Sequence, residues 1–219
     1  IELMSVSLYI IAGFMRKKDR SNESALKYFL LGAFATGFLL YGIALIYGTA
    51  GTTDLVAISK VFPQLSHNPV FLVGCGLLVV AFSFKIAAVP FHMWAPDVYE
   101  GAPTTVSGFM STGAKAAAFA TFLLVFVRVF DIAGSSLSQV IAVIAAASMI
   151  VGNITAVAQN NVKRMLAYSS IAHAGYMLSG IAAANIEGET GILFYLLAYT
   201  FVNVGAFGVV SLMERQDDK

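Results

Sequence analysis

The sequence predicts an all-α, polytopic transmembrane helix bundle of about seven spans, the first of them truncated, and three observations support this fold class. The chain is 58% hydrophobic and only 11% charged, with a mean hydropathy of +0.81, whereas soluble domains carry roughly 25% charged residues. Its apolar residues fall into runs of about 20, the length that crosses a bilayer as a helix. No long alternating strand pattern accompanies them, so a membrane β-barrel is not expected.

The first apolar run ends at Met15 and is too short to cross a bilayer. The chain begins at Ile1 without an initiator Met or the basic segment of a signal peptide. We therefore expect this run to be the end of a transmembrane helix whose beginning is missing, and residues 1–219 to be a single transmembrane domain inside a longer protein. The six further runs are Tyr28–Tyr47, Val70–Phe91, Thr104–Val127, Val140–Ala158, Met165–Ala184 and Gly191–Met213.

The basic residues predict which ends of these spans face the cytoplasm. If all seven runs cross, one side receives Arg16, Lys17, Lys18, Arg20, Lys27, Lys163, Arg164, Arg215 and Lys219, and the other receives Lys60 and Arg128. Cytoplasmic loops carry an excess of Lys and Arg. We therefore expect loops 16–27, 92–103 and 159–164 and the C-terminal end to be cytoplasmic.

Several functional classes are excluded by what the sequence lacks. The net charge of +1 provides no basic field for nucleic acid. The single cysteine, Cys75, excludes an intramolecular disulfide and a CxxC motif, and His67, His92 and His173 do not have metal-ligand spacing. Because no nucleophile–base pair, glycine-rich phosphate loop or Fe–S spacing is present either, we expect no metal, cofactor, redox or hydrolytic chemistry on this chain.

Lys115 is the clearest candidate for function. It is near the middle of its run, about 16–18 Å from either end, so its ammonium cannot reach the headgroups. A charge at that depth costs about 2.5–3.5 kcal/mol, and intramembrane ionisable residues are therefore functional candidates by default. Small and hydroxyl neighbours such as Ser111 and Gly113 permit close helix contact and water. We interpret Lys115 as a proton-transfer lysine; a static buried ion pair is the alternative.

Lys85 lies five residues before Pro90, within an apolar run. Pro90 removes a backbone hydrogen bond and clashes with the carbonyl of Ile86, which predicts a discontinuous helix near Pro90. Such interruptions occur in membranes only where protein or a cavity satisfies the freed backbone groups, and transporters use them as ion sites. We interpret Lys85 as a second proton-transfer residue, with snorkelling to the nearby membrane face as the alternative.

The segment that follows, from Trp94 to Pro103, contains two acids, a glycine and two prolines. This composition predicts a rigid connecting loop. Trp94 lies near a predicted helix end, where an interfacial aromatic is expected, although core packing explains it equally well.

Two further residues complete the candidate set. Glu2 lies about 21 Å from Arg16 by helical rise, so it should be deep in the membrane. A carboxylate there either pairs with a lysine such as Lys85 or stays protonated. His173 lies eight residues into its run and could carry a proton between waters, although a structural helix–helix hydrogen bond explains it as well.

Two stretches of sequence resemble a known family. The first reads Lys85-Ile-Ala-Ala-Val-Pro-Phe-His-Met-Trp-Ala-Pro-Asp-Val-Tyr-Glu-Gly-Ala-Pro-Thr104 and is followed by Ser-Thr-Gly-Ala-Lys115. The second reads Ala156-Val-Ala-Gln-Asn-Asn-Val-Lys-Arg-Met-Leu-Ala-Tyr-Ser-Ser-Ile-Ala-His-Ala-Gly-Tyr176. Both are similar to the antiporter-like subunits of respiratory complex I, the proton-translocating NADH:quinone oxidoreductase, and most of all to its subunit N branch.

The resemblance implies a subunit of about fourteen helices built from inverted repeats, of which this chain would hold the fifth to the eleventh. It implies that Lys85 lies on a broken helix and pairs with Glu2, that Lys115 bridges from the next helix, and that His173 continues a polar axis. It further implies a bacterial inner membrane and neighbouring antiporter-like subunits as partners. NAD, FMN, Fe–S clusters and quinone would be used by partner subunits, with none on this chain.

Three functions remain open from the sequence. The first is proton translocation through Glu2, Lys85, Lys115 and His173, driven by redox reactions on other subunits. The second is an Mrp-type cation/proton antiporter subunit, which would exchange Na⁺ for H⁺ without a redox partner. The third is a structural membrane scaffold in which the buried charges form fixed pairs.

Overall fold

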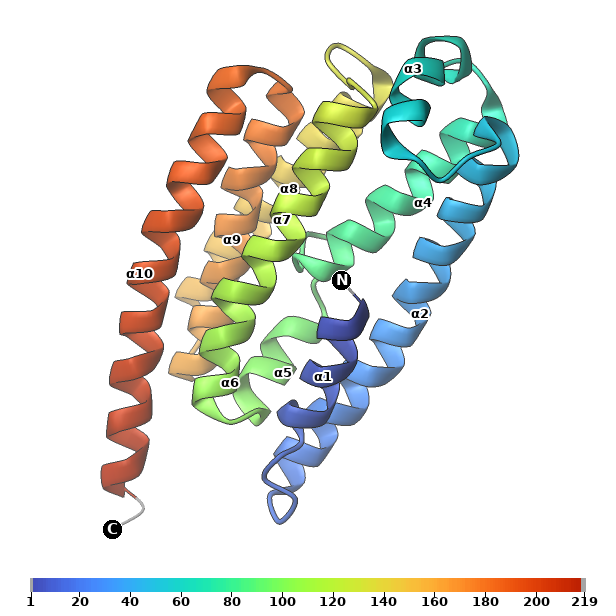
Figure 1. The fold of residues 1–219 in the computed structure, drawn as a ribbon. Helices are drawn as coiled ribbons and strands as arrows, with labels where there is room; N and C mark the ends of the chain where they lie inside the picture. The colour runs from blue at the N-terminus through green and yellow to red at the C-terminus, as the bar shows by residue number, and fades with distance from the viewer. Residues whose placement is uncertain (1, 218–219) are drawn as a thin grey trace.

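The computed structural model describes residues 2–217, which form a bundle of helices without a strand in that range (Figure 1). The elements in chain order are α1 (Glu2–Ala12), α2 (Asp19–Ala50), α3 (Leu55–Leu65), α4 (Pro69–Lys85), α5 (Trp94–Gly101), α6 (Thr104–Phe109), η1 (Met110–Ala114), α7 (Lys115–Leu123), η2 (Leu124–Val129), α8 (Ser136–Val157), α9 (Val162–Ala183) and α10 (Ile186–Asp217). The predicted all-α class is confirmed.

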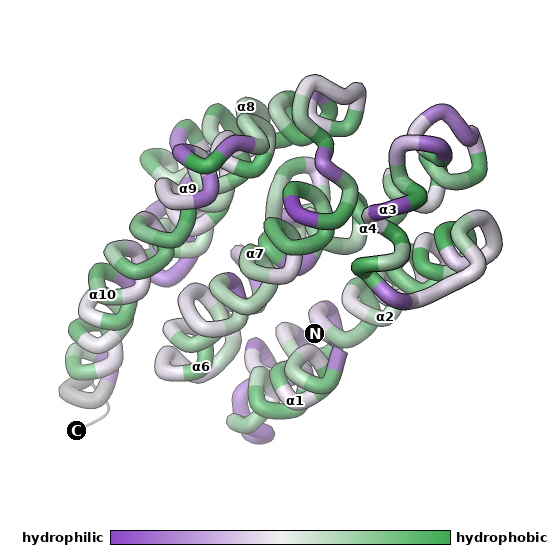
Figure 2. The backbone as a smooth tube through the Cα atoms, turned by 45° about the horizontal axis from the view of Figure 1, so that its top comes forward, coloured by the Kyte–Doolittle hydropathy of each residue, from purple (hydrophilic) through white to green (hydrophobic). Residues whose placement is uncertain are grey.

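Four of these helices are long and apolar enough to cross a membrane. They are α2, the continuous helix Thr104–Val129 formed by α6 to η2, α8, and residues Ile186–Glu214 of α10. Helices α1 and α4 are apolar but shorter, and α9 lies between α8 and α10 as a 22-residue helix. Hydrophobic residues cover most of the helix lengths, and hydrophilic residues gather near the connections (Figure 2).

The connections separate into two ends of the bundle, as the span order predicts. The α1–α2 loop, the start of α6, the start of α9 and the C-terminal end lie at one end (Figure 1). Helix α3 and the α7–α8 and α9–α10 connections lie at the other. We call the first the lower end and the second the upper end, following the view in Figure 1.

Two short helices were not predicted. Helix α3 lies in a segment that the sequence analysis left between two spans. It is apolar but, with 11 residues, too short to cross a membrane. It begins after Asp54, whose carboxylate accepts hydrogen bonds from two backbone N–H groups of the first turn. Helix α5 occupies the predicted loop 92–103, and its Pro96 stands in the first turn, where a missing N–H is tolerated.

The predicted discontinuity near Pro90 is confirmed, but the helix ends earlier than the apolar run does. Helix α4 stops at Lys85, after which Ala87 adopts a left-handed conformation with φ of 58° and the Val89–Pro90 peptide is cis. The chain then reaches α5 without regular structure. The run to Phe91 was therefore too long as a helix by six residues, and Lys85 stands at the break itself.

Side chains from other helices satisfy the backbone groups that this break exposes. The indole of Trp94 donates to the carbonyl oxygen of Phe84 at 3.0 Å, and the N–H of Val89 donates to the hydroxyl of Ser148 at 2.9 Å. Trp94 is only 3% exposed and stacks on Tyr28. Of the two interpretations that the sequence left open for Trp94, the structure supports core packing, and the side chain stabilises an interrupted helix.

Helices α8 and α9 pack against each other through small residues. A methyl group on Gly152 would meet the backbone nitrogen of Ala172 at 2.6 Å, and one on Gly175 would meet the carbonyl oxygen of Ala145 at 2.7 Å. Such close backbone approach is typical of membrane helix pairs. It fixes the face of α9 that carries Ser170 and His173.

Candidate functional site

Glu2 and Lys85 form an ion pair at mid-depth in the bundle. The Nζ of Lys85 lies 2.9 Å from Oε1 of Glu2 and donates to the hydroxyl of Ser5 at 2.6 Å. The other carboxylate oxygen of Glu2 accepts from the hydroxyl of Thr36 at 2.9 Å. The Lys85 side chain is 7% exposed and that of Glu2 is 33% exposed. Lys85 therefore does not snorkel to a membrane face, because its ammonium is held inside the bundle by α1.

Lys115 is buried without a carboxylate partner among the residues that the structure describes. It is 2% exposed, and its Nζ donates to the carbonyl oxygen of Ser170 at 2.7 Å and to the Ser170 hydroxyl. No ion pair among the side chains of residues 2–214 includes it. The alternative of a static ion pair is therefore not supported within this range. Neutral oxygens hold an ammonium less strongly than a carboxylate does.

His173 lies on the same helix as the partner of Lys115. It follows Ser170 by three residues, which places both on one face of α9. Its Nδ1 lies 2.6 Å from the hydroxyl of Tyr195, and its ring lies 5.0 Å from that of Tyr199. The structure thus joins Glu2 to Lys85, and Lys115 to the helix face of His173. Among the described residues, no hydrogen bond or ion pair links Lys85 directly to Lys115.

A π-helical segment precedes Lys115 directly. Residues Met110–Ala114 form η1, and Lys115 is the first residue of the α-helix that follows. The hydroxyls of Ser111 and Thr112 donate to the carbonyl oxygen of Gly108, and such bonds compete with the regular helix ladder. Single π-turns inside α-helices are frequent at functional sites. The cluster of Gly, Ser and Thr residues was visible in the sequence, but the π geometry was not predicted.

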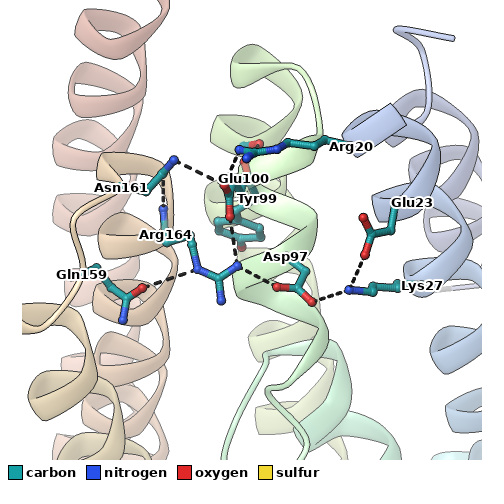
Figure 3. Close-up of polar contacts among 10 residues, drawn as sticks. Arg20, Glu23, Lys27, Asp97, Tyr99, Glu100, Gln159, Asn161 and Arg164 are labelled. Carbon is teal, nitrogen blue, oxygen red and sulfur yellow. Dashed lines mark hydrogen bonds and ion pairs between the residues drawn. The ribbon is translucent and has the colours of Figure 1, made fainter. Parts of the chain in front are cut away.

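A network of ion pairs, which sequence analysis missed, ties α5 to two other helices at the lower end. Arg164 of α9 contacts Asp97 at 2.7 Å and Glu100 at 2.9 Å (Figure 3). On the other side, Lys27 of α2 contacts Asp97 at 2.8 Å, and Arg20 contacts Glu100 at 2.7 Å. These groups surround a polar cavity of about 220 Å³. We call this set the α5 ionic cluster.

The α5 ionic cluster changes the acidity of Asp97, which lies in the connection outside the candidate spans. Burial raises the pKa of this carboxyl, but the hydrogen bonds from Lys27 and Arg164 outweigh burial and hold the pKa below its ordinary value of 3.8. A lowered folded-state pKa contributes stability that is complete above the unfolded value and is lost as the pH falls through the folded value. The cluster is therefore fully formed at neutral pH.

We expect Asp97→Asn to destabilise the full-length subunit by about 1–2 kcal/mol at pH 7, because one carboxylate shared by two partly exposed cations is lost. Thermal unfolding in detergent measures this effect. The matched control is Glu23→Gln, which removes only an exposed i,i+4 pair with Lys27. The difference between Asp97→Asn and wild type should shrink below pH 3.8. A difference that is absent at pH 7, or equal to that of the control, would contradict the importance of the cluster.

Within residues 2–214, no group of three or more His, Cys, Asp or Glu side chains is arranged to hold a metal ion. What the described polar groups can do is hold and pass protons. Two buried ammonium groups and one imidazole lie on neighbouring helices of an apolar bundle, next to hydroxyl groups that both donate and accept.

Comparison with known proteins places this geometry in a family. A family model described as "NADH:quinone oxidoreductase/Mrp antiporter, TM" matches residues 1–219. The chain belongs to this family. The resemblance inferred from the two motifs is thereby confirmed.

Curated members of the NADH:quinone oxidoreductase/Mrp antiporter family are close in sequence. NADH-quinone oxidoreductase subunit N of Trichlorobacter lovleyi is 53% identical over 100% of this chain, and that of Salinibacter ruber is 54% identical over 98%. The aligned regions cover 45% and 43% of those relatives. The chain thus spans less than half the length of these curated relatives.

Solved structures share the fold. A chain of respiratory complex I from Thermus thermophilus superposes with a TM-score of 0.81 at 43% identity, over 96% of this chain and 44% of that one. A chain of the Mrp complex from Dietzia sp. superposes with a TM-score of 0.82 at 27% identity, over 90% and 36%. Complexes of respiratory and antiporter type therefore both contain this architecture.

Proposed function

We propose that this chain is the part of a subunit N-type membrane protein that moves protons for NADH:quinone oxidoreductase. The observation that carries the proposal is Lys115, an ammonium group 2% exposed in an apolar bundle and held by Ser170 alone among the described residues. A lysine without a fixed counter-charge exchanges its proton more readily than one in an ion pair, because loss of the proton relieves the burial of charge. The identity of the curated relatives, 53% and 54%, supports the same function.

The geometry supports a stepwise mechanism. Glu2 stabilises the protonated form of Lys85 while the two groups are 2.9 Å apart. When that pair opens, Lys85 loses this stabilisation and can release its proton toward Lys115. Lys115 then passes a proton to the side of α9 that carries His173, whose imidazole can both accept and donate. The cycle closes when Lys115 takes up a proton and returns one to Lys85 as the Glu2–Lys85 pair re-forms, and when His173 releases its proton onward.

Energy for this cycle would come from redox reactions on partner subunits. We propose that NAD, FMN, Fe–S clusters and quinone are used there, and that this chain contributes to a proton-translocating enzyme at the level of the complex. The partners would be neighbouring antiporter-like membrane subunits and the bilayer of a bacterial inner membrane. The excess of basic residues at the lower end supports a cytoplasmic location for loops 16–27, 92–103 and 159–164 and for the C-terminal end.

A second candidate is an Mrp-type cation/proton antiporter subunit. The superposition on a chain of the Dietzia Mrp complex favours this alternative, since the same bundle serves both kinds of complex. The lower identity to that chain, 27% compared with 43% for the Thermus complex I chain, places it second.

The experiment that separates the two uses the full-length subunit in its complex, in inverted membrane vesicles. NADH:quinone turnover and proton uptake are recorded while Na⁺ is varied and a protonophore or a sodium ionophore is added. We expect proton uptake that follows turnover, does not depend on Na⁺ and collapses with the protonophore alone. Uptake of Na⁺ that persists or increases with the protonophore would favour the antiporter and contradict the proposed function.

A further inference from the structure

A stripe of buried hydroxyl residues leads from the lower end of the bundle to Lys115. Thr104, Ser107 and Ser111 precede Lys115 at steps of three, four and four residues, so all of them lie on one helix face. They are 4%, 0% and 0% exposed. The stripe is about 16 Å long by helical rise. The outer faces of the bundle that would contact lipid are apolar, whereas this stripe of hydroxyl groups is buried inside. Contact with lipid therefore does not explain the stripe.

One carboxylate connects the lower end of this stripe to the outside. The hydroxyl of Thr104 donates to Oε2 of Glu214, which lies near the end of α10. The other oxygen of Glu214 lies 3.8 Å from Nζ of Lys163, and the Glu214 side chain is 50% exposed. Glu214 therefore touches the buried hydroxyl stripe directly while half of its side chain remains outside the described bundle.

Two buried hydroxyl groups mark the upper end of the stripe. Tyr99 and Tyr199 are 0% and 4% exposed, and neither hydroxyl makes a hydrogen bond of ordinary geometry with a described residue. Both interact with the side chain of Ser170, the residue that holds Lys115. Buried hydroxyls are almost always hydrogen-bonded to protein or to ordered water. These two hydroxyls therefore add groups that can donate and accept protons beside Ser170, the residue that holds Lys115.

From these contacts we propose that Glu214 collects protons at the lower end and delivers them to Lys115 along the stripe of Thr104, Ser107 and Ser111. The inference rests on the proposed function and adds the uptake route that this function requires. A proton taken from water by Glu214 passes to a neighbouring hydroxyl or water, which releases its own proton to the next. In this structure the hydroxyls of Ser107 and Ser111 donate to the backbone carbonyl oxygens of Tyr99 and Gly108, so each hydroxyl turns toward its neighbour along the stripe to pass a proton on. Every oxygen ends unchanged, and the neutral amine of Lys115 becomes an ammonium.

Glu214 fits this task better than the acids of the α5 ionic cluster. Asp97 and Glu100 are each held by two cations at 2.9 Å or less, whereas Glu214 has one described cation at 3.8 Å. Lys163 is itself shared, because it donates to the carbonyl oxygen of Ala102 at 2.7 Å. The charged groups that face Lys163 from the surrounding elements are Glu214, Glu100 and Lys18. Of these three acids, Glu214 is therefore the one held least tightly by cations, and it is the one that contacts the hydroxyl stripe.

The test replaces Glu214 by Gln in the full-length subunit of the assembled complex. The amide keeps an oxygen for Thr104 but cannot collect a proton. In inverted vesicles we expect proton uptake and coupled turnover to fall at least about tenfold at neutral pH, because the carboxylate that collects protons is lost while the hydroxyls of the stripe remain. As the pH rises, the rate of proton uptake should decline more steeply in Glu214→Gln than in wild type. Glu214→Asp, which restores a titratable group, should recover most of the rate.

The matched control is Glu187→Gln, which removes an exposed acid from the opposite end of the same helix. It should leave the rates unchanged. A second variant, Tyr199→Phe, removes one of the two buried Tyr hydroxyls beside Ser170 and should slow uptake severalfold without preventing assembly. If Glu214→Gln prevents assembly, Tyr199→Phe alone decides, because a normal rate in that variant overturns the route.

Several outcomes would overturn the inference or the function on which it rests. Normal uptake in the assembled Glu214→Gln complex would show that protons enter elsewhere. Equal losses of pumping in Glu214→Gln and Glu214→Asp would show that the carboxylate only fixes α10 against α6. An equal loss of pumping in the control Glu187→Gln would show the same. Loss of pumping in Lys115→Ala with normal pumping in Glu214→Gln would reject the uptake route alone, whereas normal pumping in Lys115→Ala would reject the proposed function.

Discussion

Replacing Lys115 by Ala will abolish proton pumping and coupled turnover in an otherwise assembled complex, with a loss of at least about a hundredfold. The size follows from removing a proton-transfer group rather than a supporting contact. Assembly should persist, because Lys115 has no described carboxylate that the substitution would leave unpaired. The measurement is NADH:quinone turnover and proton uptake in inverted vesicles, after the complex has been shown to assemble.

Lys115→Arg separates proton transfer from charge. Arginine stays protonated in proteins and keeps the positive charge, but it cannot give up its proton. We expect this variant to be as inactive as Lys115→Ala. Lys60→Ala, which removes an exposed lysine from α3, is the control and should behave as wild type. Recovery of pumping in Lys115→Arg would mean that a fixed charge suffices, and the scaffold function would then be favoured.

The second large effect concerns the Glu2–Lys85 pair. Glu2→Gln removes the counter-charge of an ammonium that is 7% exposed, so we expect Lys85 to lose its proton and pumping to fall at least about tenfold. Breaking a buried pair on one side costs about 3–5 kcal/mol, and the partial exposure of Glu2 places this pair at the lower limit or below it.

A double-mutant cycle tests that pairing. The variants are Glu2→Gln, Lys85→Met and the two combined, compared in thermal stability and in pumping. The combined variant should be more stable than the sum of the two single losses predicts, because neither charge is left alone. Additive losses of stability would show that the two groups do not interact in the full-length protein, and unchanged pumping in either single variant would remove that residue from the route.

Sequence patterns predicted most of the helices and identified the two buried lysines of the candidate site. Apolar runs of bilayer length located the long helices, since lipid requires every backbone group to be satisfied within the helix. Depth within a run singled out Lys115 and Glu2, because position along a helix converts directly into distance from the headgroups. A proline in an apolar run indicated the interrupted helix.

Other features were not predictable because they depend on contacts between distant segments. Arg20, Glu100 and Arg164 look like ordinary loop charges until the fold brings α2, α5 and α9 together. Trp94 has the position of an interfacial residue, and only its contact with the carbonyl oxygen of Phe84 shows why it is buried. The end of α4 at Lys85 depends on the backbone of Ala87, a residue type that gives no sign of a left-handed conformation.

The π-helical segment η1 has a consequence for how the charge of Lys115 could be redirected. A π-turn contains one more residue than an α-turn. If η1 became regular α-helix, the residues on one side of it would rotate by about 100° relative to the other side. The ammonium of Lys115 would then leave Ser170 and face a different neighbour, with a shift of only about 1.5 Å along the helix axis. In this bundle, a change from π-helical to α-helical turns in η1 would be enough to replace the group that accepts a proton from Lys115 by another.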